Sequence, residues 1–234
     1  MIIMAFDSTA KSASVAVLDG ERVLANYSID NGLTQSELLL PMAEDALRSL
    51  KLSFSDVGLY ACSSGPGSFT GVRIGVSLIK GLAFDKNVPC VGVSTLLALA
   101  ENLAGLRGII VPVMDARREQ VYTAIFTSDA KTLTRECEDK AISITELAQE
   151  LKNRTEPIYL VGDGYAVVKR AFDKLGVKTE NTPELLLLEN AASVGRVAYR
   201  AYLNGECGTD LTVAPTYLRM PQAERERLER EKTN

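Results

Sequence analysis

The groups in this sequence that could do chemistry are carboxylates, hydroxyls, lysines, cysteines and backbone amides, because the chain contains no histidine. Without an imidazole it cannot build a Ser-His-Asp or Cys-His nucleophile, an HExxH zinc site or a histidine pH switch. Its four cysteines, Cys62, Cys90, Cys137 and Cys207, form no CxxC pair. We therefore expect no zinc site and assign no metal ligand.

Two aspartates stand at the ends of apolar, strand-like runs: Asp7 ends residues 2–7 and Asp115 ends residues 110–115. In nucleotide-dependent folds that open on two strands, such an aspartate holds Mg²⁺ and a glycine-containing hairpin wraps the phosphate. Here residues 7–12 read Asp-Ser-Thr-Ala-Lys-Ser and lack that glycine. Each aspartate therefore has two interpretations, a metal-binding carboxylate or a side chain that caps amides in its own turn.

A glycine-rich turn between a strand and a helix contains Gly65, Gly67 and Ser68, where backbone amides could face an anion. Its spacing is G-x-G-x-x-x-G, unlike the dinucleotide pattern, and no Gly-Lys-Ser/Thr follows. A tight structural turn and a phosphate-binding loop are equally consistent with it. Together with Asp7, these three residues form the candidate nucleotide-binding site.

Apolar patterning and turn signals predict that the first half has the order βββαβαβα. Asp19-Gly20 is a hairpin signal, and Thr34-Gln-Ser-Glu37 fits a helix capping box. The expected strands are 2–7, 13–19, 22–29, 59–63 and 90–93, and the expected helices are 34–51, 69–85 and 95–104.

The second half starts like the first: residues 110–115 align with residues 2–7 at an offset of 108 residues. A second strand follows each of these runs, so the sequence predicts two related lobes. We expect an N-terminal lobe over 1–105, a C-terminal lobe over 106–220 and a charged tail over 221–234. The further strands are 121–126 and 158–161, and the further helices are 145–153, 165–175 and 190–204.

The charge and hydropathy of the chain limit its surroundings. The net charge of −4 argues against a surface that carries most of a nucleic-acid contact. No apolar run approaches 18 residues, and no basic segment precedes the apolar start, so we expect a cytoplasmic protein without a membrane span. The tail is predicted to be a solvated helix or frayed, with a role in gripping a partner as the alternative.

Helix 69–85 has nearly two apolar stripes, and helix 34–51 is similarly apolar. A helix packed on one sheet needs only one stripe, so the sequence predicts a protein–protein surface on this helix pair. The alternative is that the extra faces bury against each other. The residues we nominate for partner binding are Leu39, Ala43, Ala46, Val72, Gly75, Val76 and Ile79. Replacement Val76→Glu is expected to abolish association while leaving a folded monomer.

Several segments, in this order along the chain, resemble the bacterial TsaB (YeaZ) family. They include Asp7-Ser-Thr, the helix start Ser36-Glu-x-Leu-Leu-Leu-Pro41, Gly92-Val-Ser-Thr95, Met114-Asp-Ala-Arg117, Gly162-x-Gly164 and Pro215-x-Tyr-Leu-Arg219. The most specific is the eleven-residue block Gly65-Pro-Gly-Ser-Phe-Thr-Gly-Val-Arg-Ile-Gly75. Many family members have a histidine where this chain has Gln35.

The resemblance implies an α/β, two-lobed actin-like ATPase/sugar-kinase fold of the ribonuclease H-like type, with an incomplete nucleotide site. It implies a non-catalytic scaffold that binds a TsaD-like paralogue, acting with a TsaE-like ATPase, in making N6-threonylcarbamoyladenosine on tRNA. The family's bundle helices match helices 34–51 and 69–85. On this interpretation the partner carries most of the tRNA contact, and the chain self-associates into a homodimer when alone.

No tightly bound cofactor is expected, and ATP or ADP with Mg²⁺ would bind only at the partner junction. The alternative function is an active ATP-dependent kinase or ATPase of the same fold. It would need Mg²⁺ on Asp7 or Asp115 and phosphate loops at 65–68 and 162–164. The missing glycine after Asp7 argues against it.

Overall fold

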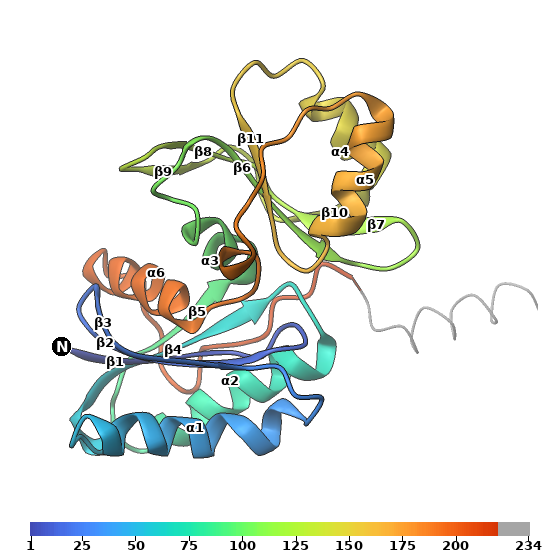
Figure 1. Cartoon of the computed structure of the whole chain (residues 1–234). Coiled ribbons are helices and arrows are strands. Elements are labelled where there is room, and N and C mark those ends of the chain that lie inside the picture. Colours follow the sequence, from blue (N-terminus) through green and yellow to red (C-terminus); the bar gives the residue numbers. More distant parts are fainter. Residues whose placement is uncertain (220–234) are drawn as a thin grey trace, which may run out of the picture.

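The computed structural model describes residues 1–219, and its N-terminal lobe is built on a five-stranded sheet of order β3-β2-β1-β4-β5 (Figure 1). The strands β1, β2 and β3 are antiparallel, whereas β4 and β5 run parallel to β1. Their bounds are β1 Ile2–Asp7, β2 Ala13–Asp19, β3 Arg22–Ile29, β4 Val57–Gly65 and β5 Cys90–Ser94.

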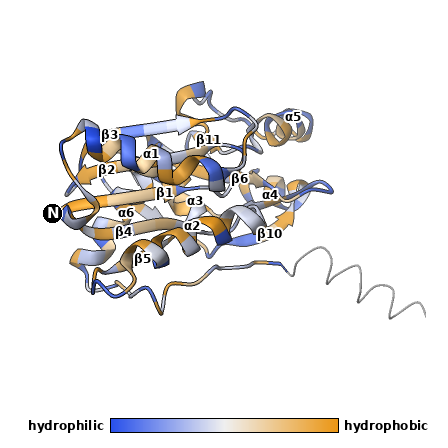
Figure 2. Ribbon diagram, turned by 90° about the horizontal axis from the view of Figure 1, so that it is seen from below, coloured by the Kyte–Doolittle hydropathy of each residue, from blue (hydrophilic) through white to orange (hydrophobic). Residues whose placement is uncertain are grey.

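The central strands of this sheet are buried on both faces, which explains why β1 and β2 are almost continuously apolar. Met4 and Phe6 face one pair of helices, α1 (Gln35–Ser49) and α2 (Phe69–Ala83). Alternate residues such as Ile3 face the other pair, α3 (Thr95–Glu101) and α6 (Ala191–Leu203). The edge strand β3 carries hydrophilic stretches where β1 is hydrophobic (Figure 2).

The C-terminal lobe has a six-stranded sheet of order β10-β7-β6-β8-β9, with β11 parallel to β6. The helices α4 and α5 cover its outer face. The bounds are β6 Arg107–Asp115, β7 Gln120–Thr123, β8 Phe126–Asp129, β9 Leu133–Arg135, β10 Lys140–Ser143, α4 Ile144–Leu151, β11 Ile158–Val161 and α5 Tyr165–Leu175. Short 3-10 turns, η1 Phe54–Asp56 and η2 Glu184–Leu186, complete the described elements.

The layers follow one another from α1–α2 through the first sheet, α6–α3 and the second sheet to α4–α5 (Figure 1). Helix α3 joins the lobes, because Leu96 and Leu99 pack against Ile110 and Phe126 of the second sheet. The α1–α2 layer is therefore the outermost layer on its side of the molecule.

The two lobes repeat one arrangement, as the offset of 108 residues predicted. Strand β1 pairs antiparallel with β2 and parallel with β4, and β6 pairs in the same way with β7 and β11. Asp7 and Asp115 end the equivalent strands. One difference is that the expected strand 121–126 is two strands, because β6 pairs with β7 near Asp115 and with β8 near Arg107.

The predicted boundary of the C-terminal lobe is wrong for its last part. Helix α6 packs on the N-terminal sheet, since Ala191, Val194 and Ala198 lie against its apolar face. The chain then pairs Gly208 with Cys90 and buries Val213 in the N-terminal core. We call residues 213–219 the C-terminal strap; the predicted tail over 221–234 lies outside the described residues.

Between residues 1 and 219, no helix combines the length and the apolar character needed to cross a bilayer.

Candidate partner-binding face and interlobe cleft

The start of α1 is fixed by hydrogen bonds, of which the sequence predicted the one between Thr34 and Glu37. The backbone amide of Thr34 donates to the Glu37 carboxylate at 3.2 Å, as in a capping box. One residue on, the Gln35 side-chain amide donates to the carbonyl of Ala10 at 2.8 Å. Gln35 therefore ties α1 to the hairpin after β1, the turn over residues 8–12.

The seven residues nominated for partner binding lie in the chain's own core, so the nominated face is wrong. Leu39, Ala43 and Ala46 of α1 are at most 1% exposed, and Val72 and Ile79 of α2 are equally buried. Gly75 and Val76 complete this inner stripe. The inner stripe packs on the apolar face of the sheet, so its residues are unavailable to a partner except Leu39, which also lines the open groove between α1 and α2.

Two glycines of α2, Gly71 and Gly75, face the inside of the chain as well. A Cβ at Gly71 would collide with the carbonyl oxygen of Ser8, and a Cβ at Gly75 would lie 3.0 Å from the Ser8 hydroxyl. The Ser8 hydroxyl also donates to the Gly71 carbonyl at 2.8 Å. These glycines therefore allow α2 to lie close to the backbone of the hairpin after β1 in the same chain.

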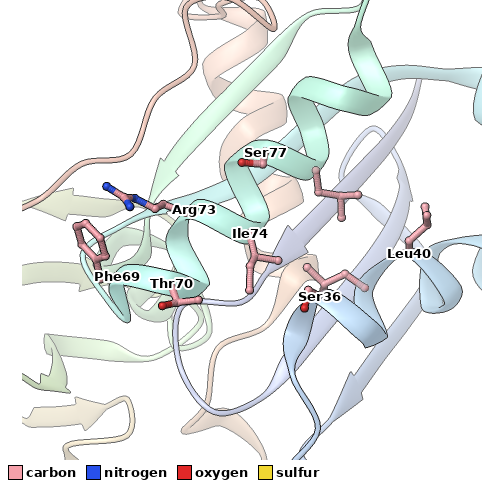
Figure 3. A pocket seen from close by; sticks show the side chains of 9 residues that line it. Ser36, Leu40, Phe69, Thr70, Arg73, Ile74 and Ser77 are labelled. Carbon is pink, nitrogen blue, oxygen red and sulfur yellow. The ribbon is translucent and has the colours of Figure 1, made fainter.

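The second apolar stripe of α2 lines a groove between α1 and α2, with a cavity volume of about 650 Å³ (Figure 3). Ile74 and Leu78 contribute from α2, and Leu40, which is 39% exposed, contributes from α1. We call this the α1–α2 groove, and its lining consists of Ser36, Leu39, Leu40, Phe69, Thr70, Arg73, Ile74, Ser77 and Leu78.

The two helices that form the groove differ in charge. The exposed acidic residues of α1 are Glu37, Glu44 and Asp45, of which Asp45 pairs with Arg48. The basic residues of α2 are Arg73, which lines the groove, and Lys80, which is not among the lining residues. An apolar groove between an acidic helix and a basic helix is complementary to a second helix pair of the same design.

Asp7 is buried at the end of β1, and its carboxylate is engaged within the chain. The amide and the hydroxyl of Thr9 donate to Oδ1 at 2.9 and 2.8 Å, and the Ser63 hydroxyl donates to Oδ2. Burial raises the pKa of Asp7, against the lowering effect of these hydrogen bonds. This geometry matches the interpretation in which Asp7 caps its own turn.

The glycine loop is likewise occupied by the chain itself. The amide of Ser68 donates to the Thr9 carbonyl at 2.7 Å, and a Cβ at Gly67 would lie 2.7 Å from the same oxygen. Gly65, with φ of +118°, packs against the carbonyl of Thr216. The loop thus contacts the hairpin after β1 through Thr9 and the C-terminal strap through Thr216.

A polar cleft of about 510 Å³ separates the lobes beside this loop, and both Asp115 and Asp163 line it. The Asp163 carboxylate accepts from the Asp115 amide at 2.9 Å, and Asp115 accepts from the Arg117 amide at 2.7 Å. The partial burial of Asp163 and its proximity to Asp115 raise its pKa. Within residues 1–219, no group of acidic or cysteine side chains is arranged to hold a metal ion.

Glu189 is a residue that the sequence analysis missed. It is 3% exposed, and neither carboxylate oxygen has a hydrogen-bond partner among the described residues. Burial and the nearby carboxylates of Asp7 and Asp163 raise its pKa well above the usual value for glutamate. No sequence signal marks it, because a glutamate before a helix N-cap ordinarily lies at the surface.

The C-terminal strap is the second feature that was missed. Tyr217 stacks on Phe69 with ring centroids 4.8 Å apart, and Arg73 Nε donates to the Tyr217 hydroxyl at 2.8 Å. Further on, Arg219 donates to the carbonyl of Ala116 at 3.0 Å, across the cleft. The motif Pro215-x-Tyr-Leu-Arg219 was visible in the sequence, but not the elements that it contacts.

The repeated lobes define a protein of the actin-like ATPase and sugar-kinase fold class. The activator of 2-hydroxyisocaproyl-CoA dehydratase from Clostridium difficile, solved with bound ADPNP, shares this fold with a TM-score of 0.50 at 10% identity, covering 88% of this chain and 97% of that one. The family model described as "TsaD: tRNA N6-adenosine threonylcarbamoyltransferase" matches residues 34–227.

More similar proteins identify the family. The tRNA threonylcarbamoyladenosine biosynthesis protein TsaB of Bacillus subtilis is 30% identical over 99% of this chain and 100% of its own. The structure of YeaZ from Pseudomonas aeruginosa superposes with a TM-score of 0.77 at 25% identity, covering 93% of this chain and 99% of that one. This chain belongs to the TsaB (YeaZ) family, within the wider group that the TsaD family model describes.

Proposed function

We propose that this protein is a non-catalytic scaffold that binds a TsaD-like enzyme through the α1–α2 groove and so supports the synthesis of threonylcarbamoyladenosine on tRNA. Membership of the TsaB family supports the pathway, since the relative from Bacillus subtilis is named for threonylcarbamoyladenosine biosynthesis. The observation that carries the scaffold role is the open apolar groove on the outermost helix layer. Such contiguous apolar surface is typical of protein interfaces.

The expected partner carries a helix pair equivalent to α1 and α2. The TsaD family model covers this chain from residue 34 onward, which includes both helices. Two such pairs related by an approximate twofold axis would place the acidic helix of one against the basic helix of the other. We expect this contact to bury roughly 1,200–2,000 Å² in total. The same geometry supports a homodimer when the partner is absent.

Two observations support the non-catalytic role: the chain has no histidine, and groups that could bind a nucleotide or Mg²⁺ form hydrogen bonds within the chain. There is no histidine, the Asp7 carboxylate accepts hydrogen bonds within its own lobe, and the Ser68 amide is bonded to Thr9. We propose that the chain alone binds no nucleotide tightly and that ATP or ADP with Mg²⁺ binds only at the partner junction. A TsaE-like ATPase is a further partner, and tRNA is held mainly by the TsaD-like subunit.

Light scattering on a sizing column tests the scaffold role, with this protein alone and then mixed with the TsaD-like protein of the same organism. We expect a 1:1 complex to replace a self-associated species. Leu78→Glu, which places a charge in the groove, should prevent the complex, whereas Leu203→Glu, at an exposed leucine of α6, should not. If the two wild-type proteins elute separately with and without nucleotide, the proposal is wrong.

A further inference from the structure

The rim of the α1–α2 groove contains an arginine whose side chain is oriented by two aromatic rings. The Arg73 guanidinium carbon lies 3.8 Å from the centroid of the Phe69 ring, and Arg73 Nε donates to the Tyr217 hydroxyl at 2.8 Å. Figure 3 shows the guanidinium of Arg73 beside the Phe69 ring at one end of the groove. The side chain thus has little rotamer freedom left to lose on binding.

Within the described residues, the Arg73 guanidinium forms a side-chain hydrogen bond only through its Nε–H. Its Nε–H is used by Tyr217, and up to Arg219 no carboxylate forms an ion pair with Arg73. The remaining N–H groups of a guanidinium form a planar fork that matches a carboxylate in a bidentate pair. An arginine that is exposed, oriented and not ion-paired within residues 1–219 is well prepared for an acidic ligand.

The stacking of Tyr217 on Phe69 is positioned by the C-terminal strap, which lies outside the helix pair. The Thr216 amide donates to the Ser64 carbonyl at 2.7 Å, which fixes the strap at the end of β4 and sets Tyr217 over Phe69. Tyr217 is 41% exposed, so part of it remains available for contact. Because Phe69 and Arg73 also line the groove, a helix docked there would meet the strap as well.

We propose that Arg73, positioned by Phe69 and Tyr217, receives an aspartate or glutamate carboxylate of the docked partner, so that the C-terminal strap is part of the partner-binding surface. This inference rests on the proposed function, because the occupant is the helix pair of the TsaD-like subunit. The TsaD family model covers both helices of this chain, so such a subunit carries a counterpart of α1. In a twofold contact that counterpart crosses α2, and α1 is the acidic helix of the pair in this chain. Aromatic and arginine side chains are also the residues that most often dominate interface energies.

Calorimetric titration of the full chain with the TsaD-like protein, at low and high salt, tests this assignment. Arg73→Met keeps the length and apolar packing of the side chain and removes the fork; we expect it to weaken binding by about tenfold or more. Arg73→Lys should recover only part of that loss, because an ammonium makes no bidentate pair. Tyr217→Phe should weaken binding less than Arg73→Met does. In the double variant, Tyr217→Phe should cause no further loss of affinity beyond that of Arg73→Met.

The matched control is Lys80→Met, which removes the other cation of the same helix. If Lys80→Met weakens binding as much as Arg73→Met, the effect is one of general charge and the inference is wrong. It is also wrong if Arg73→Met binds like the wild type, or if only self-association is weakened, which would make the occupant a second copy. If the wild-type chain binds no TsaD-like partner at all, the proposed function fails and this inference fails with it.

Discussion

The backbone carbonyl of Thr216 occupies the space in which a side chain at Gly65 would stand. The two residues are brought together by the Thr216 amide, which donates to the Ser64 carbonyl at 2.7 Å. Gly65, for which the sequence left open a structural turn and a phosphate-binding loop, therefore has a structural use here. It allows the C-terminal strap to lie against the end of β4 and to reach Phe69 and the cleft.

Gly65→Ala is accordingly expected to destabilise the protein by about 2 kcal/mol or more, because the new Cβ meets the Thr216 carbonyl and the backbone φ of +118° disfavours L side chains. Urea unfolding measures the change. Gly81→Ala is the control, since Gly81 lies in α2 with no atom within 4 Å of an added Cβ. That change should stabilise by about 0.5–1 kcal/mol. Equal stability of the two variants would contradict the role given to Gly65.

The two apolar stripes of α2 show how far sequence reasoning could go. Hydrophobic periodicity located two stripes on α2 and correctly predicted that the helix is more apolar than one sheet contact requires. It could not decide which stripe meets the sheet, because both are similarly apolar and the choice depends on long-range packing against β1, β2 and β4. The structure buries Val72, Val76 and Ile79 and leaves Ile74 and Leu78 at the groove.

Val76→Glu, first expected to leave a folded monomer, is therefore expected to unfold the chain, because Val76 is 3% exposed and has no partner for a charge. Ile74→Glu, two residues away and at the groove, should leave the monomer folded and prevent association. Circular dichroism and sizing chromatography separate the two results. A folded, partner-free Val76→Glu monomer would show that the inner stripe is the interface after all.

The occupied glycine loop leads to a prediction about nucleotides. Because Ser68 donates to Thr9 and Asp7 is engaged by Thr9 and Ser63, Mg²⁺-ATP should neither stabilise the isolated chain nor be hydrolysed by it. Thermal unfolding with millimolar Mg²⁺-ATP, together with a phosphate-release assay, measures both. A clear increase in Tm that disappears in Asp7→Asn would instead favour the alternative, an active ATPase or kinase.

Local signals predicted the elements well, and tertiary placement much less well. The hairpin at Asp19-Gly20, the capping box at Thr34 and the repeated strand that ends at Asp115 were all visible in short stretches of sequence. The return of α6 to the first sheet and the stacking of Tyr217 on Phe69 join residues far apart in the chain. Nothing in the residues near Glu189 indicates that its carboxylate is buried beside Asp7.

The burial of Glu189 makes stability depend on pH in a definite direction. Its pKa is raised in the folded state by burial and by the carboxylates of Asp7 and Asp163, so the folded chain favours the protonated acid. Its contribution is fully present below the pKa of an unfolded glutamate and is lost as the pH rises through the folded pKa. The wild-type chain should therefore lose stability from this residue as the solution passes from acidic to alkaline.

Glu189→Gln keeps the shape of the side chain and cannot ionise, so it should remove this loss. We expect the variant to gain stability over the wild type progressively as the pH rises above the pKa of an unfolded glutamate, as measured by urea midpoints at each pH. Glu184→Gln, at an exposed position five residues earlier, is the control and should leave the pH profile unchanged. Wild-type and Glu189→Gln curves that stay parallel over the whole range would mean that Glu189 titrates alike in the folded and unfolded chains. Convergence at acidic pH with divergence at alkaline pH would instead identify Glu189 as a buried proton-binding site beside Asp7.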